Sequence, residues 1–384
     1  RATWGALGNE RIGDFPYMST IAFGNTIFYQ NNGIYFDQTA SQQKYAIENV
    51  TWEKTESTDI GLDISFLNNR LRVNGDYYWK NTKDMLLAMA IPDFLGFSDP
   101  DVNAGKMSTK GYELNVSWND HIGDFSYGIA INFSDFTSKM GDLQGTQFLG
   151  DKVKMEGSEF NEWYGYVSDG LFLTEEDLKN SPKINDKNTQ LGDIKYKDIS
   201  GPDGVPDGKI SPEYDRVLLG SSLPHFLYGG NINLDYKNFD LSLAFQGVGK
   251  QNARLAREMV EPFRNNYGNF PAIIDGNYWS PYNTDEQNAV AKYPRLTHVN
   301  KSSNYAMSDY WLFNGGYFRL KNITLGYTFP KEWMNAIGIK GARIYASASD
   351  LFCLSKYPKG WDPEMGVSEY PITTSILLGV SVNF

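Results

Sequence analysis

The feature that most constrains the fold of this chain is an alternation of apolar and polar residues with a period of two. Ile60, Leu62, Ile64 and Phe66 alternate with polar or small residues, and the same pattern recurs along the whole sequence. A period of two is that of a β-strand whose two faces meet different surroundings. The alternation predicts an all-β chain of about nine strands, at residues 53–66, 70–83, 106–119, 124–137, 225–236, 239–249, 316–329, 340–352 and 371–384.

The connections between these strands alternate in length. Short turns are expected near 67–69, 119–124, 237–238 and 330–340, and long connections fill 84–105, 138–224, 250–315 and 353–370. Soluble domains seldom carry irregular loops of that length. Outer-membrane barrels combine short periplasmic turns with long extracellular loops. The rhythm therefore predicts an antiparallel transmembrane β-barrel portion in a bacterial outer membrane, with its long loops extracellular.

Aromatic residues support the same interpretation. They make up 15% of the chain and cluster near the ends of the apolar faces, as in Tyr77 with Trp79 and Tyr236 with Phe239. Barrels that span lipid carry aromatic girdles at both interfaces. The opposite faces of the strands carry Asp, Asn, Arg and Lys, which suits a wet interior better than a packed core.

Hydropathy alone points the other way. Mean hydropathy is −0.45, and the longest fully apolar run, Met85–Ile91, is far shorter than the ~20 residues of a transmembrane helix. A soluble carbohydrate-binding β-sandwich therefore stays open as an alternative at this point.

Charge, cysteine content and motifs exclude several classes of function. The chain has 35 Lys and Arg against 46 Asp and Glu, a net charge of −11, which argues against a nucleic-acid partner. The single cysteine, Cys353, excludes an internal disulfide framework and a cysteine zinc site. Phosphate-loop, H-E-x-x-H and G-x-S-x-G motifs are absent, and the three histidines are scattered. We expect no catalytic residues and no enzyme activity.

Nine strands also leave two open sheet edges. Unpaired backbone groups in hydrocarbon cost several kcal/mol each, so we expect the barrel to close through residues outside this sequence. The segment Arg1–Ala6 is interpreted as the outer end of one more strand.

Several motifs bring the sequence close to a known family. The matching stretches are Thr51–Thr55, Asp59–Asp63, Asn69–Leu71, Asp76–Lys80, Gly192–Asp198, Phe318–Tyr327 and Val380–Phe384. With them, the chain resembles the C-terminal barrel portion of SusC/RagA-type TonB-dependent transporters of Bacteroidota outer membranes, over nearly all of residues 1–384. Val380–Phe384 is similar to the chain end that the barrel-assembly machinery recognises.

The resemblance implies a barrel of about 22 strands, of which residues 1–384 supply the C-terminal part, with the plug and N-terminal strands elsewhere. It implies import of glycans or oligopeptides, driven by TonB through the missing part, under a SusD-like surface lipoprotein that acts as a lid. The remaining strands, the plug, and lipid with lipopolysaccharide would be further partners. A passive porin-like or structural outer-membrane barrel is the alternative.

Aromatic side chains in the long connections are the candidate substrate contacts, because such rings stack on sugars or peptide side chains and lose little rotamer entropy on binding. The alternative is that they pack loops together or contact a lid. The candidates are Trp163, Tyr164, Tyr166, Tyr278, Trp279, Tyr282, Tyr310, Trp311 and Trp361. Short structural helices are expected at Thr174–Leu178 and Gln251–Val260.

One stretch has the composition of a calcium loop, while no cofactor is otherwise indicated. Asp198, Asp203 and Asp207 lie among glycines, and Ca²⁺ takes six to eight oxygen ligands from closely spaced acids. Pro202 breaks the EF-hand spacing, and Lys209 occupies the position of the bidentate acid. The alternative is a Gly/Pro/Asp turn in an outer loop.

Overall fold

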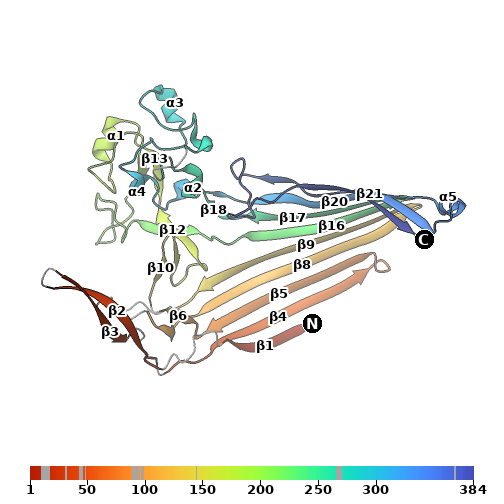
Figure 1. Ribbon diagram of the computed structural model, residues 1–384, viewed down its shortest axis with the longest axis horizontal. Coiled ribbons are helices and arrows are strands. Elements are labelled where there is room, and N and C mark those ends of the chain that lie inside the picture. Colours follow the sequence, from red (N-terminus) through yellow and green to blue (C-terminus); the bar gives the residue numbers. More distant parts are fainter. Residues whose placement is uncertain are drawn as a thin grey trace.

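A large antiparallel sheet dominates the computed structural model, which describes residues 1–9, 18–30, 33–42, 46–47, 49–88, 94, 96, 99–143, 145–264, 270–366 and 369–384. Ten strands follow one another in the order β1-β4-β5-β8-β9-β16-β17-β20-β21-β22 (Figure 1). They are β1 Ala2–Asn9, β4 Glu53–Phe66, β5 Leu71–Lys83, β8 Met107–Ile122, β9 Phe125–Met140, β16 His225–Tyr236, β17 Phe239–Lys250, β20 Tyr317–Thr328, β21 Gly341–Ser355 and β22 Ser375–Asn383. All nine predicted strands are present, and β1 is the additional strand expected at the start of the sequence.

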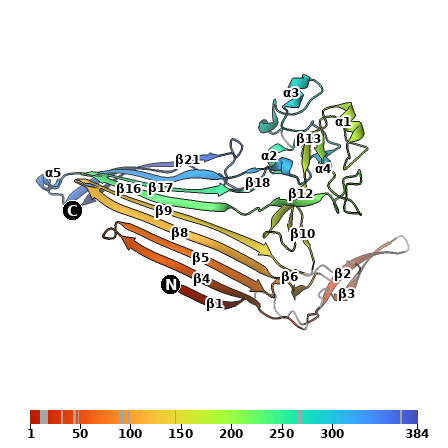
Figure 2. The same ribbon diagram turned by 180° about the vertical axis from the view of Figure 1, so that it is seen from behind.

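The two ends of the sheet differ as predicted. One end carries tight turns, such as the turn through Leu67, Asn68 and Asn69, whose φ angles of 53°, 56° and 66° are left-handed. The helix α5, Lys331–Ala336, belongs to the turn between β20 and β21. The long connections all emerge at the other end, as Figure 1 and the reverse view in Figure 2 show.

The two faces of the sheet also differ. Strand register aligns one apolar row across nine strands: Phe66, Leu71, Trp118, Ile129, Ile232, Leu243, Ile323, Ala348 and Ile376. The next row, on the opposite face, is Asn119, Gly128, Asn233, Ser242, Thr324, Ser347 and Leu377. The apolar face has no packing partner within the described residues, and Leu378 is 81% exposed. An uncovered apolar band over polar inner rows is the pattern of a barrel wall in lipid.

Two of the long connections, residues 141–224 and 251–316, fold together into one body, here called the loop unit. The first contributes β10 Gln147–Leu149, β11 Lys152–Lys154, β12 Glu162–Tyr166, β13 Ser168–Leu171, α1 Glu175–Asn180, β14 Ile194–Tyr196 and β15 Arg216–Gly220. The second contributes β18 Asn252–Arg254, α2 Arg257–Val260, η2 Ala272–Ile274, α3 Asp285–Ala289, α4 Lys301–Asn304, η3 Asp309–Trp311 and β19 Leu312–Asn314.

The two helix predictions fared differently. Thr174 caps α1, because its hydroxyl accepts a hydrogen bond from the Asp177 amide at 3.0 Å. The helix expected over Gln251–Val260 is wrong in its first half. Those residues form β18, which pairs with β19 across the second connection, and only the residues of α2 are helical. A cross-strand partner 60 or so residues away gives no signal in local sequence, and here it overrides helix propensity.

Two further hairpins emerge at the same end of the sheet. β2 Ile21–Gln30 pairs with β3 Gly33–Gln42 and projects away from the sheet (Figure 1), and β6 Leu86–Ala88 pairs with β7 Asp101–Asn103. Part of the apolar run Met85–Ile91 forms β6, and residues 89–91 lie outside the described residues. No helix in the described part of the chain is long and apolar enough to cross a membrane.

Candidate functional site

The loop unit is fastened by one buried carboxylate. Asp193, fully buried and contributed by the first connection, accepts hydrogen bonds from three side chains of the second. Arg295 donates from Nε at 2.7 Å and from Nη2 at 3.1 Å, and the amides of Asn300 and Asn304 each donate at 2.8 Å. A buried charge is tolerated where an opposite charge and hydrogen bonds surround it, so this cluster holds the two connections together.

Aromatic side chains fill the core beside that cluster. Trp311 is 2% exposed, stacks on Tyr305 with ring centres 5.1 Å apart, and donates its indole N–H to the Asn304 carbonyl at 2.9 Å. Tyr166 is also buried and lies against Tyr196, with 5.3 Å between ring centres. Two of the predicted substrate contacts, Tyr166 and Trp311, are therefore placed in the core of the loop unit, where their rings contact other side chains.

Burial also shapes the ionisation of this core. It raises the pKa of Tyr196, whose hydroxyl donates to the Ser303 carbonyl at 2.7 Å. It raises the pKa of Tyr305 as well, with a further contribution from the nearby Glu261 carboxylate. Both phenols are thus held in their neutral form far above neutral pH.

Three other predicted residues share one surface cavity. Tyr278, Trp279 and Tyr282 line a hollow of about 600 Å³ together with Glu175 and Leu178 of α1. Tyr282 is 96% exposed, so its ring is free to meet a ligand. Trp279 is half-buried, because its indole packs on the backbone of Gly192, where a side chain would collide with the ring. The cavity offers aromatic surface with polar groups at its rim, a combination suited to small polar ligands.

Trp163 lies in a second cavity, of about 510 Å³, where the loop unit meets the sheet. The remaining candidates do not line either of these two cavities. Tyr164 packs on Phe148 and under the Arg216 guanidinium, Tyr310 donates to the Lys292 carbonyl at 2.9 Å, and Trp361 packs against the core from the connection after β21. The structure thus brings Tyr278, Trp279 and Tyr282 together at one cavity. A second group gathers at the core of the loop unit, where Tyr310 meets Trp311 edge-on with ring centres 5.2 Å apart, and where Tyr166 and Trp361 also pack.

The candidate calcium loop has its carboxylates engaged with its own backbone. Asp198 accepts from the amide of Gly208 at 2.5 Å, and Asp207 accepts from the amide of Lys209 at 3.0 Å. Asp203 is exposed. Within the described ranges, no group of three or more His, Cys, Asp or Glu side chains is placed to hold a metal ion. These contacts are also those of a Gly/Pro/Asp turn, and a cation at this loop stays a prediction.

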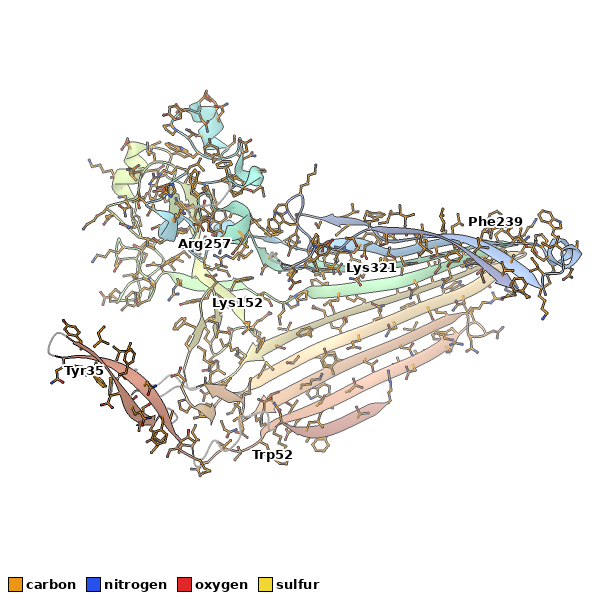
Figure 3. All side chains as sticks on the ribbon, in the orientation of Figure 1. Tyr35, Trp52, Lys152, Phe239, Arg257 and Lys321 are labelled. Atoms are coloured by element: carbon orange, nitrogen blue, oxygen red, sulfur yellow. The ribbon has the colours of Figure 1, made fainter. Side chains whose placement is uncertain are left out.

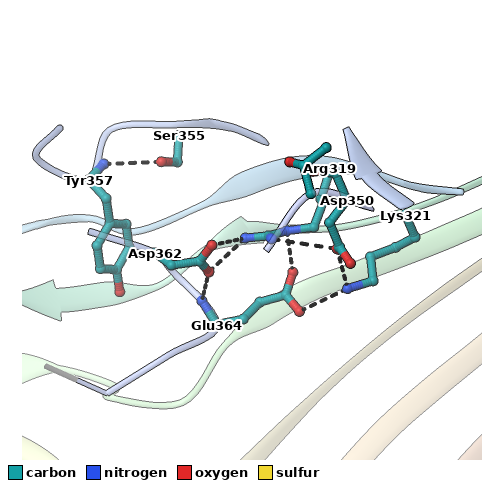
Figure 4. Close-up of polar contacts among 8 residues, drawn as sticks. Arg319, Lys321, Asp350, Ser355, Tyr357, Asp362 and Glu364 are labelled. Atoms are coloured by element: carbon teal, nitrogen blue, oxygen red, sulfur yellow. Dashed lines mark hydrogen bonds and ion pairs between the residues drawn. The ribbon is translucent and has the colours of Figure 1, made fainter. Parts of the chain in front are cut away.

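A charged cluster fastens the last long connection, residues 356–374, to the sheet. Arg319 of β20 is 2% exposed and donates to both carboxylate oxygens of Asp362 at 2.6 Å (Figure 4). Its Nε lies 2.7 Å from Glu364, and Lys321 lies 2.6 Å from Asp350 of β21. Asp350 has a φ of 50° and sits where the register between β20 and β21 shifts, as at a β-bulge beside a functional element.

Sequence reasoning gave Asp193 and Arg319 no structural role, although both lie in stretches that carry the family resemblance, Gly192–Asp198 and Phe318–Tyr327. Each belongs to a cluster that combines single charges far apart along the chain, such as Asp193 with Arg295 and Arg319 with Asp362. Neither the motifs nor the isolated charges indicate which distant residue would be the partner.

The fold defines a class: a segment of a large outer-membrane-type barrel wall with tight turns at one end and a structured loop body at the other. A family model described as "TonB dependent receptor-like, beta-barrel" matches residues 20–351. The chain belongs to that family, whose members are outer-membrane β-barrels, and the resemblance to SusC/RagA-type transporters is confirmed.

Named relatives agree with this assignment. The chain is 30% identical to TonB-dependent receptor P3 of Formosa agariphila, over 95% of this chain and 35% of the relative. It is 28% identical to TonB-dependent receptor SusC of Bacteroides thetaiotaomicron, over 100% of this chain and 37% of that protein. The solved RagAB peptide transporter shares the fold, with a TM-score of 0.75, 22% identity and coverage of 99% of this chain and 40% of the solved one. The chain thus spans less than half the length of these relatives.

Proposed function

We propose that this chain forms part of the wall and mouth of an outer-membrane importer of glycans or oligopeptides, powered by TonB through other parts of the protein. The observation that carries the proposal is the loop unit, a folded body with two cavities at the end of the sheet opposite the tight turns. A passive pore needs no such body. In this proposal the loop unit faces the outside of the cell, and further strands close the sheet at β1 and β22.

Uptake by cells that carry the full-length protein tests this proposal. Import of a substrate too large for porins should stop when the proton gradient is collapsed, because TonB draws its energy from that gradient. Import that continues unchanged without the gradient would favour the passive porin-like alternative. Growth that does not depend on the gene at all would contradict an import role.

The hairpin of β2 and β3 is our candidate contact for a SusD-like lipoprotein lid. Its register puts Phe23, Ile27, Tyr29, Ile34 and Phe36 on one face, and each of these is more than 60% exposed. An isolated two-stranded hairpin is at best marginally stable in water, and contiguous exposed apolar surface marks a contact with another protein or a membrane. Its apolar face therefore calls for a covering partner.

Co-purification tests the contact. The double variant Phe23→Asp/Phe36→Asp should lose the lipoprotein from the detergent-extracted complex. The control Ser41→Asp lies on the opposite face, where Ser41 pairs with Ala22, and should retain it. Equal retention of the lipoprotein by both variants would show that the hairpin is not the contact site.

A further inference from the structure

The second cavity lies at a junction of three chain segments. Lys152 and Trp163 come from the first connection of the loop unit, Arg254 and Arg257 from the second, and Tyr357 from the connection after β21. Lys152 and Arg257 mark the place where the loop unit joins the sheet (Figure 3). Its volume of about 510 Å³ is in the range of small-molecule sites.

The cavity is cationic, although the chain as a whole is acidic. Three cations line it, Lys152, Arg254 and Arg257, against one carboxylate, Glu258, which is itself paired with Arg264 at 2.5 Å. Arg254 pairs with Asp151, and Arg257 pairs with Glu261, which Lys301 also contacts. Counting these partners, five cations stand against three carboxylates, in a chain whose net charge is −11.

Two of the lining cations have binding capacity left over. Lys152 has no carboxylate within 4.0 Å among the described residues, and its ammonium lies 4.6 Å from the centre of the Trp163 ring. Burial lowers the pKa of Lys152, so an anion beside it would stabilise the charged form. The buried Nε of Arg254 has no hydrogen-bond partner in the described structure, and a buried unsatisfied donor is unfavourable until an acceptor reaches it.

The aromatic rings of the cavity are held in place. Trp163 donates its indole N–H to the Asn252 carbonyl at 2.6 Å. Tyr357 packs edge-on against Phe313, with ring centres 4.9 Å apart. The site therefore sets fixed ring surfaces next to fixed cations, which limits the entropy lost when a ligand binds.

We propose that this cavity binds a uronate residue of an acidic oligosaccharide, with Lys152 and Arg254 at the carboxylate and Trp163 and Tyr357 beside the sugar ring. A uronate carries its carboxylate at the edge of a sugar ring, so a cation and an aromatic side chain that lie close together, such as Lys152 and Trp163, can contact both parts of one residue. A peptide terminus presents its carboxylate on a flexible backbone without such a ring. The inference rests on the proposed import function and names the class of substrate.

Binding to the purified full-length protein in detergent tests this assignment separately from transport, because it needs neither TonB nor a proton gradient. The probes are oligogalacturonate, a neutral galacto-oligosaccharide of equal length and an oligoglutamate peptide, titrated by calorimetry. We expect oligogalacturonate alone to bind, with an affinity that falls as salt is added. Lys152→Gln should weaken binding about tenfold or more, because it removes a charge-assisted contact.

Matched variants separate the site from general charge. Lys152→Arg keeps the cation and should keep most of the affinity, while Lys179→Gln removes an exposed lysine of α1 and should leave binding unchanged. Heat-modifiability on gels confirms that each variant is folded. Equal binding of the neutral sugar, preference for the peptide, or equal effects of Lys152→Gln and Lys179→Gln would each overturn the proposal. Gradient-dependent uptake of a neutral substrate would then leave the import function intact.

Discussion

The carboxylate of Asp193 and the guanidinium of Arg295 join two connections across 102 positions of sequence, with Oδ1 to Nε at 2.7 Å and Oδ2 to Nη2 at 3.1 Å. Among the described residues of the loop unit, no other carboxylate makes as many contacts between the two halves, since Asn300 and Asn304 bind the same group. The stability of the loop unit should therefore depend strongly on this single side chain.

Replacement of Asp193 by alanine should unfold the loop unit and leave the sheet intact. The change leaves the guanidinium of Arg295, a side chain only 15% exposed, without its carboxylate partner. Breaking a buried ion pair in this way costs about 3–5 kcal/mol. Hydrogen exchange of amides in residues 141–224 should rise, while heat-modifiability of the barrel stays normal. Asp186→Ala is the control, because that carboxylate is 86% exposed. Protection equal to that of the control would contradict the role of Asp193.

Alkaline pH should destabilise the loop unit. Burial raises the pKa of Tyr196 and Tyr305, whereas tyrosine in an unfolded chain ionises near pH 10. Above that pH the unfolded state binds fewer protons than the folded one, so the free energy of unfolding is flat below about pH 10 and falls above it. Protease sensitivity and tyrosinate absorbance, followed together, measure the fall. Tyr196→Phe should make the fall shallower, and an unchanged slope would argue against this linkage.

Arginine on the apolar face should impair folding into lipid. Leu114→Arg and Leu243→Arg each place a charge on that face, where the cost at the bilayer midplane is about 2–4 kcal/mol. Asn115→Arg and Ser242→Arg put the same charge on the opposite face one residue away and should cost far less. Urea titration of the full-length protein in vesicles compares the four variants. Similar losses in both pairs would refute the assignment of the faces.

Loss of Arg319 should free the connection after β21. Arg319→Ala leaves Asp362 and Glu364 without their shared cation, and the loss of a buried partner costs about 3 kcal/mol or more. Cys353 lies opposite Arg319 in the register of β20 and β21, so its thiol reports the opening. In a full-length protein with Cys353 as the sole cysteine, maleimide labelling should accelerate. Lys359→Ala, an exposed change in the same connection, should not alter the rate.

The strands could be predicted from the sequence because the residue pattern of each strand reflects the surroundings of its two faces. A lipid-facing and a water-facing side force a period of two, so the expected range 239–249 became β17, Phe239–Lys250. Strand ends were less accurate, as for β8, which runs to Ile122 instead of residue 119. There the hairpin with β9 continues pairing through residues that the composition marked as turn.

The loop unit could not be predicted in the same way. Its core depends on contacts such as that between Tyr166 and Tyr196 and on the hydrogen bond from the Ile194 amide to the Asn304 side chain, 110 positions away. The sequence identified aromatic loop residues but could not separate the buried Trp311 from the exposed Tyr282, because both lie in similar local composition. The β2–β3 hairpin was missed because consecutive apolar residues, Ile27–Tyr29 and Ile34–Phe36, interrupt the alternation in both strands.

The hairpin of β16 and β17 lies in sequence between the two halves of the loop unit, and this imposes an order of folding. The chain ends entering and leaving that hairpin are brought together where His225 pairs with Lys250. Before β16 and β17 pair, a contact such as that between Asp193 and Arg295 must close a long flexible loop, and the entropic cost of closing it grows with loop length. Once the two strands have paired, the end of the first connection and the start of the second lie next to each other. We therefore expect the loop unit to fold only after the hairpin of β16 and β17 has formed, so that assembly of the sheet sets the time at which the loop unit can form.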